Sequence, residues 1–377
     1  MAPADGDDVT VPPDVLRALG SGGDWISSWT VAVALVAAAV VLVVWMAIRH
    51  RRGRRAWPGA VLAVPTVVVG LAIGVNAYVG YIPTTEMLRV TMSSWGIGHA
   101  PATEVATAAE TEGDQTRGAV HSATVPVPAA LKMPTDALTW VYTPPGYDPS
   151  GSARYPVLYL VHGSPGKAGD WVSAGNIAHT MDVLIASGQS VPMIVVSADV
   201  NGTGPSAGDT ECLDSTTGGS QVETYLTTVV IPWADATYRT AADAAHRAIG
   251  GFSSGAYCAL DQGLRHADLY GTVVSIAGYA DPGSGGHAML ATDQEFAAHN
   301  IAAYVSGLHG DGRHVFLSID AKEADGAVLA AQALADPLRA AGFDVATQSL
   351  PHFDHAWVYA RAAIPYGVVF FSRTLSG

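Results

Sequence analysis

The sequence predicts an α/β fold with a mostly parallel, doubly wound sheet, preceded by two transmembrane helices. Three observations predict it. Short apolar runs alternate with helical patterns over residues 119–377, a serine between glycines separates a strand-like run from a helix-like run, and two long uncharged runs stand near the N-terminus. With 377 residues, 49% hydrophobic and only 14% charged, the chain is apolar for a soluble protein. The two uncharged runs account for that excess.

The uncharged runs have the length of membrane spans. Trp29 to Ile48 contains no charged residue and is about 20 residues long, enough to cross a hydrocarbon core of ~30 Å. Trp57 to Ile82 is a second such run, with prolines and glycines that a membrane helix tolerates. The residues before the first run are acidic, unlike the leader of a cleaved signal peptide. We therefore expect transmembrane helices over 28–48 and 57–82, after an N-terminal tail over 1–27.

The loop between the spans, residues 49–56, sets the expected orientation. It holds five arginines, and the positive-inside rule places such a loop in the cytoplasm. Both termini, and everything after the second span, then lie outside the cytoplasm. A net charge of −14 argues against nucleic acid as the partner of these arginines. The abundance of alanine and of arginine over lysine is typical of a GC-rich bacterial genome, so the membrane is expected to be that of a bacterial cell.

A polar, irregular stretch over 83–118 is expected to be a linker. Residues 119–377 follow it and have a length that suits one α/β catalytic domain. Within that domain the first two strands are expected to be antiparallel and the later ones parallel, with polar loops gathered at their carboxyl ends. The expected strands are 120–127, 138–142, 157–161, 193–197, 247–250, 273–277 and 314–319, with a helix over 222–238 and a last helix beginning near Trp357.

The segment around Ser253 predicts a nucleophile on a sharp turn. Gly251 to Gly255 forms a Gly-x-Ser-x-Gly pentapeptide between an apolar run and a helix-forming run, and its glycines suit the close approach of strand and helix backbones. The same pattern recurs around Ser206, where turn-forming residues lie on both sides and no helix follows. We interpret Ser253 as the nucleophile and Ser206 as part of a loop.

A serine nucleophile needs a base, and the C-terminal region supplies two candidates. The expected chain order is serine, acid, histidine. His355 stands immediately before the last predicted helix, where a base of such a site belongs, and His352 is its rival. We favour His355.

Three acidic residues follow the strand expected over 314–319. Asp320 is adjacent to the strand, where it can instead shape the turn, whereas Glu323 and Asp325 lie where a loop can return toward the histidine. An acid here stays ionised and orients the imidazole. The residues alone leave the choice open.

Two backbone N–H groups are expected to form an oxyanion hole. One belongs to Ser254, the residue after the nucleophile, and the other to the loop that follows the strand over 157–161. In that loop Pro165 has no N–H, so Ser164 is the better donor.

Four segments together resemble the esterase family of α/β-hydrolases, which includes S-formylglutathione hydrolases, feruloyl and enterochelin esterases and the antigen 85 mycolyltransferases. They are residues 142–148, 155–163, 251–255 and 355–357. The resemblance, which covers about 139–377, implies the α/β-hydrolase fold, Ser253 as nucleophile and His355 as base. In relatives the acid commonly follows a glycine by three positions. Asp320 stands where that glycine would be, which points to Glu323.

The two cysteines, Cys212 and Cys258, both fall in the part expected outside the cytoplasm, where a disulfide is permitted. A bridge would fasten the loop over 199–221 to the helix after Ser253. Two unrelated buried thiols are the alternative. No cofactor or metal is expected, because the histidines form no spaced ligand motif and no dinucleotide or phosphate-loop fingerprint occurs.

These features predict a membrane-anchored serine esterase that hydrolyses a carboxylic ester through an acyl-serine intermediate, with a lipid-linked ester as one candidate substrate. The first alternative is an acyltransferase of the mycolyltransferase type, because the same catalytic groups serve both reactions. The second is a non-catalytic binding domain on a hydrolase fold.

Overall fold

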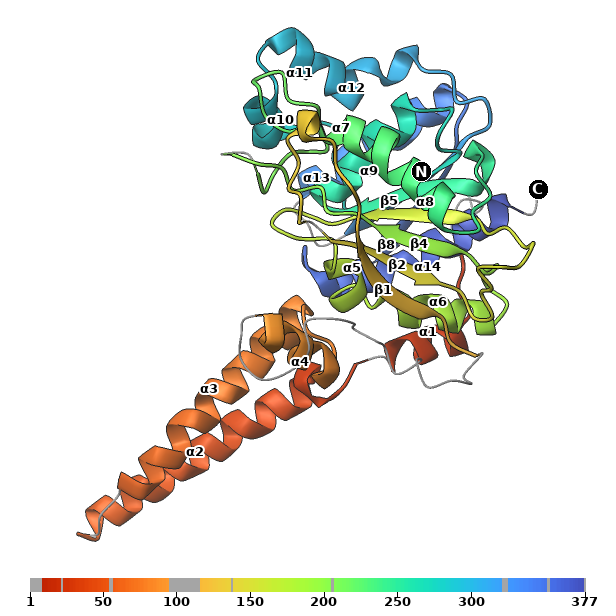
Figure 1. Cartoon of the computed structure of the whole chain (residues 1–377). Helices are drawn as coiled ribbons and strands as arrows, with labels where there is room; N and C mark the ends of the chain where they lie inside the picture. Colours follow the sequence, from red (N-terminus) through yellow and green to blue (C-terminus); the bar gives the residue numbers. More distant parts are fainter. Residues whose placement is uncertain are drawn as a thin grey trace, which may run out of the picture.

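A computed structural model describes residues 9–21, 23–53, 57–94, 116–136, 138–204, 207–320, 325–350 and 353–375. It consists of an α/β domain and a long helical hairpin, joined at one end of the hairpin (Figure 1). The hairpin is formed by α2 (Trp29–Arg51) and α3 (Trp57–Val79).

The domain is built on an eight-stranded sheet in the order β1-β2-β4-β3-β5-β6-β7-β8. The pairs β1–β2 and β2–β4 are antiparallel and all other neighbouring pairs are parallel, as the sequence predicts. The strands are β1 (Ala119–Thr124), β2 (Leu138–Thr143), β3 (Val157–Val161), β4 (Ile194–Ser197), β5 (Arg247–Phe252), β6 (Thr272–Ile276), β7 (His314–Asp320) and β8 (Asp344–Leu350).

The edge strand β8 was not predicted. Its sequence, DVATQSL, mixes polar and small residues, and only two of its seven residues are buried. An edge strand that is half exposed lacks the continuous apolar run that identifies β3 and β6.

Helices cover both faces of the sheet and enclose two clusters of buried apolar side chains. One layer contains α7 (Val222–Tyr225), α8 (Ile231–Thr237), α9 (Ser254–Arg265) and α13 (Asp325–Ala340), and the other α5 (Asp170–Ser173), α6 (Ile177–Ala186) and α14 (Trp357–Thr374). The helix expected over 222–238 is divided into α7 and α8 by a π-turn at Leu226–Val230. Three short helices, α10 (Gly283–Met289), α11 (Asp293–His299) and α12 (Ile301–Tyr304), form an outer rim.

The segment before the first apolar helix folds onto the α/β domain. Its helix α1 (Pro13–Gly20) packs against α6, and Val9, Val11 and Val15 are buried in the apolar cluster on that face. The Arg373 guanidinium donates to the carbonyl of Thr10 at 3.1 Å. The residues expected to form a tail therefore contribute to the core of the domain.

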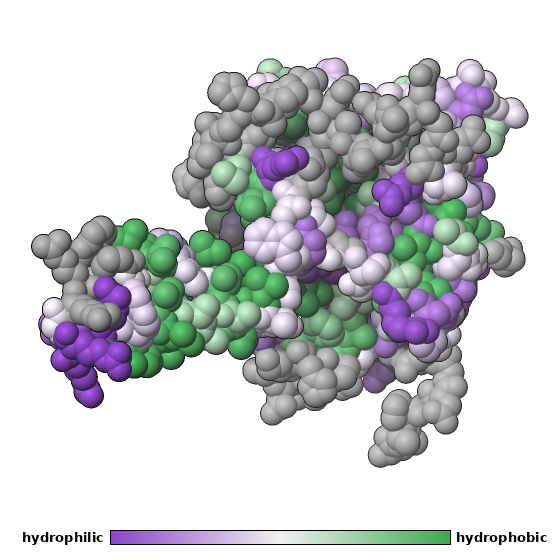
Figure 2. Space-filling model, turned by 90° about the horizontal axis from the view of Figure 1, so that it is seen from below, coloured by the Kyte–Doolittle hydropathy of each residue, from purple (hydrophilic) through white to green (hydrophobic). Residues whose placement is uncertain are grey.

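The hairpin exposes its apolar side chains. Both helices are long and apolar enough to cross a membrane, and only 11% and 17% of their apolar windows are buried. Figure 2 shows a hydrophobic surface along the hairpin, with hydrophilic residues at the tip far from the α/β domain. That tip contains the described part of the arginine-rich loop.

The other end of the hairpin is fastened by polar side chains. Asn76 donates to the carbonyls of Ile26 and Ile82 at 3.0 and 2.7 Å and accepts from the Ile82 N–H. Asp24 accepts from the backbone and hydroxyl of Thr85, at the start of α4 (Thr85–Ser94). These bonds join both helices to the segment that leads into the α/β domain.

Two side chains of the α/β domain hold this end of the hairpin. The buried Arg361 guanidinium, on α14, donates to the carbonyls of Gly80 and Ala174. Burial lowers the pKa of Arg361 to about 10. The Tyr81 hydroxyl donates to Asp170 Oδ1 at 2.8 Å. The end of α3 is thereby fixed beside α14 and α5.

Candidate active site

Ser253 lies on the sharp turn that the pentapeptide predicts, between β5 and α9. Its φ of 60° and ψ of −122° are unusual for a residue with a side chain. The glycines on either side are required by space. A Cβ on Gly251 would lie 2.1 Å from the carbonyl oxygen of Gly255, and one on Gly255 would lie 2.3 Å from that of Val161. The turn therefore presents the serine at the carboxyl edge of the sheet.

His355 lies in the loop before α14 and contacts Ser253. Its Nε2 lies 2.8 Å from Ser253 Oγ, a distance at which the hydroxyl donates its proton to the ring. The imidazole also stacks on Phe252, with ring centroids 4.8 Å apart. His352, the rival base, lies outside the described residues.

The acidic candidates follow β7, as expected. Asp320 is the last residue of β7 and Asp325 is the first residue of α13, so the loop between them starts at the same sheet edge as Ser253. Glu323 lies outside the described residues, and the side chains of Asp320 and Asp325 are not described. The assignment of the acid stays a prediction.

The structure brings the two expected oxyanion donors close to Ser253. Ser254 and Ser164 line the same small cavity of about 10 Å³, room for about one water molecule. The loop of Ser164 passes so near the elbow that a Cβ on Gly163 would lie 3.1 Å from the carbonyl oxygen of Phe252. The Ser164 hydroxyl donates to the carbonyl of Gly208 at 2.6 Å, which ties this loop to the loop over 199–221.

A buried histidine that sequence reasoning gave no role supports the loop. His162 Nδ1 lies 2.9 Å from the carbonyl oxygen of Gly163, and Nε2 accepts from the N–H of Val200 at 3.2 Å. Nε2 also lies 3.5 Å from Asp199 Oδ1, so this ring joins the loop after β3 to the segment after β4. Its position directly after β3 and before a glycine was the only available signal.

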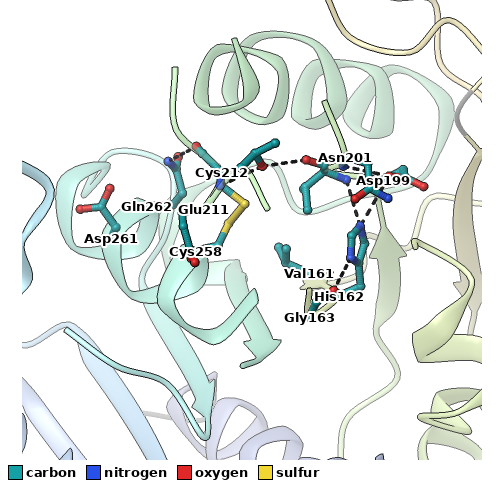
Figure 3. Close-up of a disulfide and its surroundings, with 12 residues drawn as sticks. Val161, His162, Gly163, Asp199, Asn201, Glu211, Cys212, Cys258, Asp261 and Gln262 are labelled. Carbon is teal, nitrogen blue, oxygen red and sulfur yellow. Dashed lines mark hydrogen bonds and ion pairs between the residues drawn. A yellow bond between two sulfur atoms is a disulfide. The ribbon is translucent and has the colours of Figure 1, made fainter. Parts of the chain in front are cut away.

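A disulfide joins Cys212 to Cys258, with Cα atoms 5.4 Å apart (Figure 3). It connects the loop over 199–221 to α9, one turn after Ser253. Gln262, also on α9, donates to the carbonyl of Cys212 at 3.3 Å, and Thr210 donates to the carbonyl of Val200 at 2.8 Å. The loop is therefore fixed to α9 through Cys212 and braced internally by Thr210, beside the oxyanion donors.

Glu211, next to the disulfide, was also missed. Its side chain is 6% exposed, lines the small cavity with Ser164 and Ser254, and accepts from the Tyr279 hydroxyl at 2.6 Å. Burial raises the pKa of Glu211 to about 8. A buried glutamate with this pKa is protonated at neutral pH. No sequence pattern marks it, because its burial depends on the fold of the loop.

A cavity of about 220 Å³ opens above Ser253 and His355. On one side it is lined by Gly163, Ser164 and Phe252 of the α/β domain. On the other side it is lined by Tyr78 and Val79, the last two residues of α3. The end of the apolar hairpin nearest the α/β domain therefore forms one wall of this cavity. No sequence motif predicts that arrangement.

Away from this pocket, Glu223, Asp261 and His299 bring possible metal-ligand atoms within 4.8 Å of one another. His299 Nδ1 lies 2.8 Å from Asp261, and the Tyr304 hydroxyl donates to the same carboxylate at 2.8 Å. Glu223 lies 2.8 Å from His266 Nε2. The hydrogen bonds of the buried Asp261 and its two partly buried neighbours account for the cluster without an ion.

Comparison with known proteins identifies the family of the chain. The sequence pattern of the family described as "Putative esterase" matches residues 132–358. A Corynebacterium glutamicum protein described as uncharacterized is 30% identical over 258 residues, 67% of this chain and 58% of the relative. An esterase of Mycobacterium tuberculosis is 31% identical over 162 residues, 41% of this chain and 32% of the relative. The chain thus spans less than two thirds of these curated relatives.

Solved structures share the fold of the α/β domain. A ferulic acid esterase superposes with a TM-score of 0.57 and 24% identity, over 68% of this chain and 99% of that chain. The S-formylglutathione hydrolase of Agrobacterium tumefaciens has the same TM-score with 16% identity, over 69% of this chain and 96% of that chain. At these identities the likeness establishes the α/β-hydrolase fold.

Proposed function

The chain belongs to the esterase family, and on that premise we propose that it is a membrane-anchored serine esterase whose catalytic domain lies outside the cytoplasm. The observation that carries the proposal is the 2.8 Å contact between Ser253 Oγ and His355 Nε2 at the tip of a strand-turn-helix elbow. This is the geometry in which a histidine activates a serine hydroxyl.

The reaction follows from this geometry. Ser253 Oγ attacks the carbonyl carbon of the ester while its proton passes to His355 Nε2. The negative charge that develops on the carbonyl oxygen is stabilised by the N–H groups of Ser254 and Ser164. The alcohol leaves with the proton from His355, and an acyl-serine remains. Water then gives its proton to His355 and attacks the acyl group, which releases the acid and restores Ser253.

The third member of the triad is proposed to be Glu323, with Asp325 and Asp320 as alternates. All three belong to the connection after β7, whose carboxyl end lies at the same sheet edge as the elbow. Replacing the true acid by its amide should lower kcat about 10⁴-fold, because the imidazole loses its orientation and its stabilising charge. Comparing Glu323→Gln, Asp325→Asn and Asp320→Asn identifies it.

The membrane anchor is proposed from two properties of the hairpin. Its apolar side chains are exposed rather than packed in a core, as in Val33 and Val41, which are 64% and 67% exposed. The tip opposite the α/β domain begins with Arg49 and Arg51, charges that the positive-inside rule assigns to the cytoplasmic face. Cysteines introduced at Ser150 and Gly53 test the orientation. An impermeant maleimide should label intact cells only at position 150.

The activity is tested with Ser253→Ala and with Ser206→Ala, which alters the other Gly-x-Ser-x-Gly pentapeptide. Ser253→Ala should abolish fluorophosphonate labelling and turnover of p-nitrophenyl acetate, and Ser206→Ala should leave both within about twofold of the natural protein. Fluorophosphonate labelling that persists in Ser253→Ala would refute the assignment of Ser253 as the nucleophile.

A further inference from the structure

A second, larger cavity lies between α2 and α3, in the part of the hairpin nearest the α/β domain. We call it the α2–α3 groove. Its volume is about 560 Å³, within the range of small-molecule sites. It is lined by Val33, Val36 and Ala37 on α2 and by Gly70, Gly74 and Tyr78 on α3, among other apolar residues. Apart from the Tyr78 hydroxyl and the Trp29 indole N–H, the described side chains that line it offer no polar group.

Small residues create the groove. A Cβ on Gly74 would still lie 3.7 Å from its nearest neighbour, Ala32 Cβ, so the helix surface is hollow there. Gly70 instead lets the two helices touch, because a Cβ there would lie 3.1 Å from Leu35 Cβ. The helices thus pack against each other along the hairpin and leave an open apolar groove beside Gly74.

The α2–α3 groove leads to the catalytic pocket. Tyr78 lines both cavities, and Val79, the next residue, lines the pocket of Ser253. The junction is held in place, because Arg361 binds the carbonyl of Gly80 and Tyr81 binds Asp170. An apolar chain in the groove would therefore reach the catalytic pocket at its end nearest Ser253.

We propose that the substrate is an acyl lipid of the outer leaflet, with a hydrocarbon chain lying in the α2–α3 groove and its ester at Ser253. The proposal rests on the function proposed above and specifies its substrate. In the hydrocarbon core of a bilayer the available apolar molecules are lipid chains, and a groove without charges selects them over polar ligands. The ester then enters the pocket sideways from the membrane.

The test uses two adjacent alanines of α2. Ala37 lines the groove, whereas Ala38 is exposed and does not. Ala37 is about 12 Å along α2 from Trp29, so a phenylalanine there obstructs only a long acyl chain. The full chain, reconstituted in phosphatidylcholine liposomes, is assayed with p-nitrophenyl palmitate and p-nitrophenyl acetate for the natural protein, Ala37→Phe and Ala38→Phe.

We expect Ala37→Phe to lower the palmitate-to-acetate ratio of kcat/KM about tenfold, because the phenylalanine ring overfills the space that the acyl chain would occupy. Ala38→Phe should leave the ratio unchanged. Loss of fluorophosphonate labelling would show that Ala37→Phe does not fold. In that case Val33→Phe, which also lies in the groove, replaces it. Its control is Val40→Phe, at an exposed position that does not line the groove.

Three outcomes overturn the proposal. The first is an equal ratio in the groove variant and its control, and the second is a natural protein that cleaves acetate but not palmitate. The third is a groove variant that changes the oligomeric state and not the ratio, which would assign the groove to a second copy of the chain. In each case acetate turnover and Ser253 labelling persist, so the proposed esterase stands. Their loss in the natural protein would instead refute the esterase.

Discussion

The two walls of the catalytic pocket are built in different ways. The wall that carries Ser253 and Gly163 consists of strand ends and tight turns, held by a disulfide and by buried hydrogen bonds. The opposite wall consists of Tyr78 and Val79, the last turn of an apolar helix that belongs to the hairpin. The first wall carries the groups that we propose perform the chemistry. The second borders the cavity above Ser253, so we expect the first wall to govern the reaction and the second to govern substrate choice.

The largest expected effect concerns the base that completes the first wall. His355→Gln should lower kcat/KM for p-nitrophenyl acetate by about 10⁵-fold or more, because Ser253 Oγ loses the acceptor of its proton. His352→Gln is the matched control, since it changes the same loop, and should cost less than about tenfold. A larger loss in His352→Gln than in His355→Gln would exchange the roles of the two histidines.

A smaller effect is expected from Glu211, behind the same wall. Its pKa is about 8 in the folded chain, raised by burial from an ordinary value of 4.5. Between these values the folded state holds a proton that the unfolded state releases. The stabilising contribution is therefore complete below pH 4.5 and is lost as the pH rises through 8, by about 1.4 kcal/mol for each pH unit.

Glu211→Gln removes that titration and keeps an acceptor for the Tyr279 hydroxyl. We expect the unfolding free energy of the natural chain, measured by urea titration, to fall relative to the variant between pH 5 and 8. Glu295→Gln is a control of opposite sign, because a hydrogen bond from Thr216 lowers the pKa of the exposed Glu295. The stability that Glu295 contributes is lost as the pH falls. Parallel curves for the natural chain and Glu211→Gln would show that Glu211 ionises freely.

The two walls also differ in how much of each the sequence predicts. The elbow at Ser253 and the seven predicted strands depend on local patterns, so the sequence alone predicts each of them. The sequence permits the pairing of Cys212 with Cys258 but leaves it open, because the two residues are 46 positions apart. Glu211 and the edge strand β8 carry no such pattern, because their environment arises only when distant segments pack. The same holds for Tyr78, whose local sequence predicts a membrane span and nothing about catalysis.

The N-terminal segment is another region whose burial the sequence does not predict. Its short length and acidic residues predict a tail, yet Val9, Val11 and Val15 enter the core beside α6 and α14. Isolated valines among polar residues are common at protein surfaces, and only the complementary face of the domain identifies them as buried.

The last prediction tests the junction that holds the second wall. Gly80 and Gly53 both have positive φ, 73° and 66°, so an alanine at either position carries similar backbone strain. Only Gly80 is crowded. A Cβ there would lie 2.9 Å from the backbone nitrogen of Val358 on α14, whereas nothing lies within 4 Å of Gly53.

Gly80→Ala should therefore destabilise the chain by about 1–3 kcal/mol more than Gly53→Ala, because the end of α3 must move away from α14. That movement also displaces Tyr78 and Val79 from the pocket. The KM for p-nitrophenyl palmitate should rise while kcat for the acetate ester changes little, since Ser253 and His355 belong to the other wall. Thermal unfolding and steady-state kinetics in liposomes measure both. If the two alanine variants lose stability equally and keep the same KM, the hairpin is not a wall of the pocket and substrate choice must reside in the α/β domain.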